Sequence, residues 1–112
     1  MNYYYNLYLD GKTALEEEKI RDYLEHDKWQ LEVYLVILSK SEKNQLEICH
    51  SALFLQKKLK SDDVFVVGIA KGYQEALELV EKITQDVYDE TKTTDLKSYI
   101  IKKQQEFQEG IV

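Results

Sequence analysis

Two uninterrupted apolar runs, at residues 33–38 and 64–67, stand out in the pattern of hydrophobic and polar positions along the chain. An apolar run without alternation is typical of a strand that is covered on both faces, as in a parallel sheet. We therefore predict a buried strand at each position. Gly68 and Gly72 follow the second run. Because glycine tolerates a positive φ, they predict a tight turn from this strand into a helix.

An amphipathic helix is predicted after this turn, over residues 73–87, because apolar residues recur there at spacings of three and four. The predicted stripe consists of Tyr73, Ala76, Leu77, Val80, Ile83, Thr84 and Val87. A glycine turn before a helix N-terminus can bind a phosphate through its backbone N–H groups. The spacing here lacks the patterns of known phosphate loops, and Glu75 and Glu78 in the first two turns would repel an anion. The pattern therefore favours a structural turn over an anion site.

A third strand is predicted near the N-terminus, over residues 3–9, which are rich in strand-forming tyrosines. In an alternating strand one face carries Tyr3, Tyr5, Leu7 and Leu9, and the other carries Tyr4, Asn6 and Tyr8. We expect Tyr4 and Tyr8 to pack beneath a helix with their hydroxyls reaching solvent. The alternative is an aromatic binding surface on that face.

The remaining elements are predicted from caps and periodicity. Thr13 and Glu16 match a capping box, which predicts a helix over residues 14–26. Residues 46–48 alternate and predict a short edge strand, although helical spacing also passes through them. A helix over residues 51–60 would then begin with Ser51 as its N-cap, and Thr94 would cap a last helix over residues 95–109.

This order, β-α-β-(β)-α-β-α-α, alternates strands with helices and predicts an α/β fold. We expect a small layered α/β domain with three or four strands, in a mostly parallel or mixed sheet, flanked by about four helices. The length of 112 residues is in the usual range for one domain, and no linker composition divides it, so residues 1–112 are predicted to form a single domain.

Composition narrows the classes of partner. The formal net charge is −6, with 21 Asp and Glu against 15 Lys and Arg, which disfavours binding to nucleic acid or to an anionic membrane surface. The sequence shows no apolar run of membrane-spanning length and no signal segment at its start, and it has one cysteine. We therefore expect a cytoplasmic protein that binds neither nucleic acid nor membrane.

The residues that usually carry chemistry do not assemble into a recognisable site. Cys49 and His50 are adjacent in sequence, so their side chains diverge, and the spacing of a zinc site is missing. His26 is the other histidine and lies at a predicted helix end, where the helix dipole alone explains it. We predict no catalytic residue, no metal site and no cofactor.

Two candidate surfaces remain. If the strands are parallel, their carboxyl ends bring turns to one edge, where ligands of open α/β sheets bind. The residues of this predicted edge are Lys12, Lys40, Gly68, Lys71 and Gly72. The second candidate is an interaction surface on the tyrosine-rich strand and the last helix, which carry more apolar surface than a lone small domain needs. Its residues are Tyr4, Tyr8, Tyr99, Ile101 and Phe107.

Our leading hypothesis is a non-enzymatic interaction or regulatory domain that acts as a homodimer or on a partner protein. The alternative is a binding domain or enzyme for a small anionic ligand, using the turns around Gly68 and Gly72. A pocket in which the three lysines of the predicted edge converge would favour the ligand. A turn that is plugged by side chains would favour the interaction domain.

Overall fold

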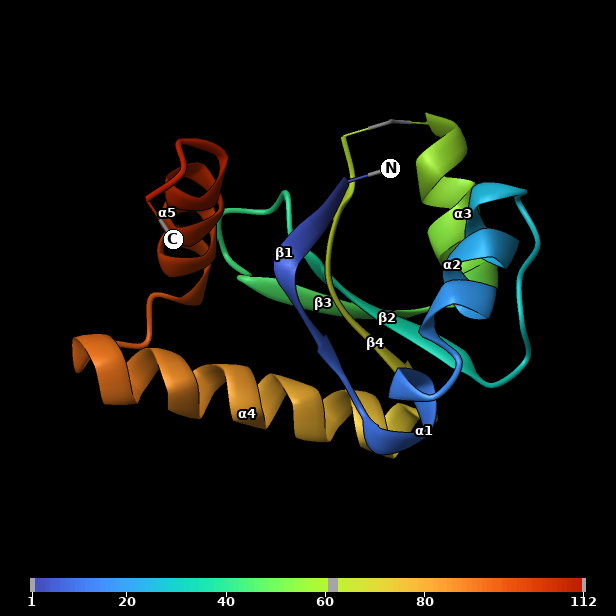
Figure 1. The fold of residues 1–112 in the computed structure, drawn as a ribbon, viewed down its shortest axis with the longest axis horizontal. Coiled ribbons are helices and arrows are strands. Elements are labelled where there is room, and N and C mark those ends of the chain that lie inside the picture. The colour runs from blue at the N-terminus through green and yellow to red at the C-terminus, as the bar shows by residue number, and fades with distance from the viewer. Residues whose placement is uncertain (1, 61–62, 112) are drawn as a thin grey trace.

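The computed structural model describes residues 2–60 and 63–111 (Figure 1). Its strands are β1 (Asn2–Leu9), β2 (Val33–Leu38), β3 (Leu46–His50) and β4 (Phe65–Lys71). Its helices are α1 (Gly11–Ala14), α2 (Glu17–Glu25), α3 (Ser51–Lys60), α4 (Tyr73–Thr91) and α5 (Leu96–Gln108). The predicted fold class is confirmed: the described residues form a small α/β fold with four strands and five helices.

The strands form one mixed sheet in the order β1-β4-β2-β3. β1 runs parallel to β4, whereas β2 runs antiparallel to both β4 and β3. The segment 46–48, which was open between strand and helix, lies in the edge strand β3. β4 begins and ends later than the predicted strand, so Gly68 lies inside β4 and not in a turn after it.

Helices cover both faces of the sheet, which explains the apolar runs of β2 and β4. On one face, Ile20 and Leu24 of α2 and Phe54 of α3 pack over β2 and β4. On the other face, α4 and α5 enclose a second core around Val36 and Val67. Figure 1 shows α2 and α3 together on one side of the strands, with α4 and α5 on the other. Among the described residues, no helix is long and apolar enough to cross a membrane.

The first strand departs from strict alternation. Its pairing with β4 is regular at Tyr3 and again at Tyr8, and the register shifts between them. Three more residues of β1 than of β4 lie within this shift, because Tyr3 pairs with Val66 and Tyr8 with Gly68. Tyr5 therefore packs in the same core as Tyr4, and the predicted assignment of Tyr5 to the opposite face is wrong.

The predicted first helix is divided in two. Asp10, not Thr13, is the N-cap of α1, and its carboxylate accepts from the Thr13 backbone N–H at 3.3 Å. Thr13 is buried, and its hydroxyl donates to the same carboxylate. Glu16 precedes α2 without a side-chain capping bond. The capping-box prediction is wrong because the Thr13 N–H and hydroxyl both donate to Asp10, and Thr13 and Glu16 do not cap each other.

Two other predicted caps have different roles. Asp95 caps α5 by accepting from Ser98 N, so the cap lies one residue after Thr94. Ser51 is the first residue of α3, and its hydroxyl bonds to the backbone of Gln30, donating to the carbonyl at 2.7 Å and accepting from the N–H at 2.9 Å. Ser51 therefore fixes the loop before β2 against the start of α3.

α4 docks on the sheet through a stripe that is rotated from the predicted one. Its buried residues are Ala76, Leu79, Ile83 and Val87. Tyr73 is 53% exposed and Leu77 is half-buried, so these two lie on the flank of the helix. The apolar residues of α4 cover about half of its circumference, and periodicity alone could not tell which part of that face the sheet covers.

Gly68 allows close packing at the centre of the sheet. A Cβ at this position would lie 3.2 Å from Leu79 Cδ1 and 3.2 Å from the Tyr8 carbonyl oxygen. The chain at Gly68 is fully buried between β1 and α4. Glycine, which has no side chain, therefore occupies the point where β4, β1 and α4 pack closely against one another.

We expect Gly68→Ala to lower the free energy of unfolding by about 1–3 kcal/mol, the usual effect of an overpacked core. Chemical denaturation monitored by far-UV circular dichroism would measure it. Gly11→Ala is the matched control, because a Cβ there meets nothing within 4 Å. Equal effects of the two substitutions would contradict this account of Gly68.

Candidate functional site

The structure separates Lys40 from the other two lysines of the predicted ligand edge. Because β2 runs antiparallel to β4, the carboxyl ends of these two strands lie at opposite ends of the sheet. Lys71 ends β4, whereas Lys40 follows β2 and forms an ion pair with Asp63 at the other end. Lys12 lies exposed in α1. β1 runs parallel to β4, so Lys12, which follows β1, and Lys71, which ends β4, lie at the same end of the sheet, and only Lys40 lies at the other end.

The turn around Lys71 is filled by the protein's own polar groups. The Lys71 backbone N–H donates to Asp10 Oδ1 at 3.2 Å, and the Lys71 ammonium pairs with Glu16. The carboxylates of Asp10 and Glu16 thus hold the ends of β1 and β4 and the start of α2 together. Lys71 lines a hollow of about 310 Å³, but Glu16, which lines the same hollow, already pairs with its ammonium group.

Gly72 has φ +115°, which a side chain rarely adopts, so the glycine is required by the turn. A Cβ at Gly72 would meet Glu75 Oε2, and the Glu75 carboxyl carbon lies only 2.9 Å from that position. The Gly72 N–H donates to the carbonyl of Glu32 at 2.8 Å. A carboxylate therefore covers the turn at the start of α4, where a phosphate would have to bind.

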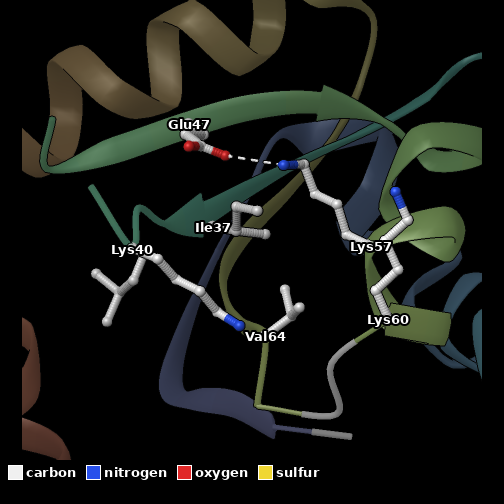
Figure 2. Close-up of a pocket in the computed structure, with 7 residues that line it drawn as sticks. Ile37, Lys40, Glu47, Lys57, Lys60 and Val64 are labelled. Atoms are coloured by element: carbon white, nitrogen blue, oxygen red, sulfur yellow. Dashed lines mark ion pairs between the residues drawn. The ribbon is translucent and has the colours of Figure 1, made fainter.

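Lys40 instead faces a small hollow with two lysines of α3 (Figure 2). The hollow has a volume of about 200 Å³. It is lined by Ile37, Leu38, Lys40, Glu47, Lys57, Lys60 and Val64. Figure 2 shows the Lys57 ammonium directed at Glu47, from which it is separated by 3.6 Å, and the Lys60 ammonium directed away from Lys40.

The charges around this hollow are largely compensated. Glu47 balances Lys57, Asp63 balances Lys40, and Lys60 lies in the last turn of α3, where a cation complements the helix dipole. The arrangement therefore offers little excess positive charge to a bound anion.

Three residues of the predicted interaction surface do come together. Tyr4, Tyr8 and Tyr99 line one open hollow of about 460 Å³ between β1, α4 and α5. The other lining residues are Tyr5, Asn6, Asp86, Asp89 and Glu90. Tyr4 is buried and its ring stacks on that of Tyr8, with centroids 6.5 Å apart. Tyr4 and Tyr8 pack beneath α4 and α5, as the first of the two interpretations expects, but the Tyr8 hydroxyl donates to Asp86 of α4.

Two of the carboxylates that line this hollow, Asp86 and Glu90, each interact with one tyrosine and one lysine. Tyr8 donates to Asp86 Oδ2 at 2.7 Å, and burial together with this bond raises the pKa of Tyr8 well above its ordinary range. Burial acts to raise the pKa of Asp86, but hydrogen bonds from Lys82 and Tyr8 outweigh it and lower that pKa.

The second of these carboxylates, Glu90, links α4 to α5. Tyr99 donates to Glu90, and Lys103 lies 3.0 Å from the other Glu90 oxygen. The hydrogen bonds from Tyr99 and Lys103 lower the pKa of Glu90, while burial and the bond to Glu90 raise that of Tyr99. Asp86 therefore ties α4 to β1, Glu90 ties α4 to α5, and the charges of both carboxylates are already partly neutralised.

The two remaining residues of the predicted surface, Phe107 and Ile101, lie apart from this hollow. Phe107 stacks on Tyr5 with ring centroids 4.6 Å apart, and Ile101 is 43% exposed. Next to this stack, the Tyr5 backbone N–H donates to Gln104 Oε1 at 2.8 Å. α5 therefore covers part of the outer edge of β1.

A different aromatic surface, which was not predicted from the sequence, lies on the same face of the sheet, beside α4 and toward β2 and β3. We call it the aromatic row; its members are Trp29, His50, Tyr34 and Tyr73. Successive ring centroids are 5.8, 5.1 and 5.8 Å apart. Trp29 is 55% exposed and Tyr73 53% exposed, so the row ends in two large, open aromatic side chains.

His50 is held in one tautomer at the centre of the row. The Ala52 backbone N–H donates to Nδ1 at 3.1 Å, so the proton lies on Nε2, which donates to the Leu31 carbonyl at 2.7 Å. His50 also pairs with Tyr34 across β2 and β3. The row was invisible in the sequence because its four members come from a loop, two strands and a helix, and only strand register brings them together.

The remaining groups that could carry chemistry, the cysteine thiol and the possible metal ligands, do not form a site. Cys49 is buried, and this burial raises the pKa of its thiol to about 11. Within residues 2–60 and 63–111, no three His, Cys, Asp or Glu side chains are grouped so that they could hold a metal ion. No protein-family model, curated protein or solved structure matches this chain.

We expect Tyr8→Phe to lower the free energy of unfolding at pH 7 by about 1–2 kcal/mol, through loss of a hydrogen bond to a carboxylate. Because folding raises the pKa of Tyr8, the stability that this group provides is fully present below its ordinary pKa of about 10 and is lost as the pH rises further. The difference between wild type and variant should therefore shrink above pH 10.

Urea denaturation at pH 7 and at several values above pH 10 would test this dependence. Tyr88→Phe is the control, because Tyr88 is 47% exposed and lies on the far flank of α4. A pH-independent effect of Tyr8→Phe would contradict the proposed role of the Tyr8 hydroxyl.

Proposed function

We propose that this protein is a non-enzymatic interaction domain, and that it binds a protein through the aromatic row. The observation that carries the proposal is the continuous contact of four rings whose two ends, Trp29 and Tyr73, are each more than half exposed. Tryptophan and tyrosine are enriched at the centres of protein interfaces, where they bury large area at a small cost in conformational entropy.

The neighbouring surface extends this apolar region. Leu31 follows Trp29 in the same loop and is 77% exposed. Along α4, Tyr73 is followed on the same flank by Leu77 and Val80, which are half-buried. This flank faces away from the β1 side of the helix, where Asp86 contacts Tyr8. The exposed apolar side chains therefore form a surface and are not scattered singly.

Fixed geometry also supports a binding role. His50 is hydrogen-bonded on both ring nitrogens, and Tyr34 lies within β2. The centre of the row is thus rigid before any partner arrives, which reduces the entropy lost on binding.

The alternative, a binding domain or enzyme for a small anion, has weaker support. Glu75 covers the turn at Gly72, and Glu16 pairs with Lys71. Lys40 lies at the opposite end of the sheet from Lys12 and Lys71, and the hollow that it lines with Lys57 and Lys60 carries compensating carboxylates.

Site-specific photo-crosslinking in the source cells would test the proposal. We expect a benzophenone amino acid at Tyr73 to give a protein adduct of discrete mass, identified by mass spectrometry as a second copy or another protein. The matched control is the same residue at Phe107, which is similarly exposed but lies on α5. Adducts at Phe107 alone would move the interface to the last helix, and their absence at both positions would refute binding through the aromatic row.

A further inference from the structure

The two edges of the sheet differ in how they are protected. β1 and β3 are the edge strands. At β1, Gln104 of α5 accepts from the Tyr5 N–H, and Phe107 stacks beside it. Among the described residues, no backbone group other than those of β2 pairs with β3. β3 is therefore the open edge of the sheet.

The alternation of hydrogen bonds between β2 and β3 shows which backbone groups of β3 face away from β2. Ser39 N donates to the Gln45 carbonyl at 3.0 Å, and the regular antiparallel register continues to Tyr34 and His50. Because hydrogen-bonded pairs alternate along an antiparallel ladder, Glu47 and Cys49 bond to β2. The backbone N–H and C=O groups of Leu46, Ile48 and His50 then point away from it.

This outer edge has few of the features that prevent strand addition. Natural edge strands are commonly protected by proline, by lysine or by a bulge. β3 has the sequence LEICH, contains neither residue, and pairs with β2 without a register shift. Its single charged residue, Glu47, is drawn toward its own chain by Lys57 and by Ser39, whose hydroxyl donates to it at 3.2 Å.

We propose that a second copy of this chain binds at β3, and that the two β3 strands pair antiparallel about a twofold axis at Ile48. This inference rests on the proposed function and specifies its partner. The pairing places Ile48 opposite Ile48, Leu46 opposite the second copy's His50, and Glu47 opposite the second copy's Cys49. No like charges lie directly opposite one another, so the strand is complementary to itself in this register.

The side chains of β3 also favour a second copy as the partner. Leu46 and Ile48 are half-buried at the rim of the core beneath α4 and α5, and a second β3 would cover them with identical apolar groups. His50 belongs both to the outward-facing edge and to the aromatic row. Pairing at β3 therefore brings the aromatic rows of the two copies to the ends of one shared strand pair.

The first test is the mass of the purified chain by sedimentation equilibrium, with Ile48→Pro as the variant. Proline removes an N–H that faces away from β2, a position at which edge strands tolerate it. We expect the wild type to dimerise, and Ile48→Pro to weaken dimerisation at least tenfold while keeping the far-UV circular dichroism spectrum. Ile48→Thr keeps the N–H and should retain most of the dimer. A monomeric wild type, or a dimer unaffected by proline, would overturn the pairing.

Cysteine cross-linking provides a second test that does not depend on how Ile48→Pro folds. Facing residues of an antiparallel pair have Cα atoms about 5.5 Å apart, within reach of a disulfide. We expect Ile48→Cys to form a covalent dimer on mild oxidation, whereas wild type does not, because Cys49 is buried. Asn6→Cys, on the exposed part of β1, is the matched control. Cross-linking through Asn6→Cys alone would overturn the proposal.

The two proposals fail separately. Photo-adducts at Tyr73 with another protein, without Ile48→Cys dimers, would keep the interaction domain and refute strand pairing. Dimers through Ile48→Cys without adducts at Tyr73 would support β3 pairing and remove the aromatic row as the working surface.

Discussion

The structure depends on the burial of β2 and β4 on both faces. These two strands are the centre of the sheet, and their residues Leu35, Val36, Val67 and Ile69 are fully inaccessible to solvent. Covering both faces of such strands requires helices on each side, so the positions of α2, α3, α4 and α5 follow from this one hydrophobic constraint. The direction of β2 is not determined by that constraint, and the location of every candidate site depends on it.

Strand and helix positions were therefore more predictable than topology. The apolar run at 33–38 specified β2 to the residue, because only a strand buried on both faces needs six such side chains in succession. The same run carries no information on whether its neighbour is parallel. An antiparallel β2 sends Lys40 and Lys71 to opposite ends of the sheet, and Glu16 and Glu75 occupy the turn that remains around Lys71 and Gly72.

Side-chain placement was predictable where a single periodicity applied. Three of the five residues predicted for one interaction surface, Tyr4, Tyr8 and Tyr99, line one hollow. Asp86 and Glu90, which bond to two of them, carried no distinguishing signal among 21 acidic residues. The register shift in β1 reversed Tyr5, and such shifts arise from backbone pairing that sequence does not display. The aromatic row also depends on strand register, because the pairing of β2 with β3 places Tyr34 beside His50. It could therefore be recognised only in three dimensions.

The asymmetry of the sheet edges connects these observations to function. An isolated four-stranded sheet has two edges, and each must be covered, distorted or paired. β1 uses the first two solutions: its register shifts, and α5 supplies Gln104 and Phe107 along its outer side. β3 is regular and ends in His50, whose ring joins Trp29 to Tyr34. The protected edge is thus β1, which lies away from the aromatic row. The edge strand beside the row, β3, keeps its outer backbone groups available. This distribution is the one expected of a sheet that is extended by a strand of another chain.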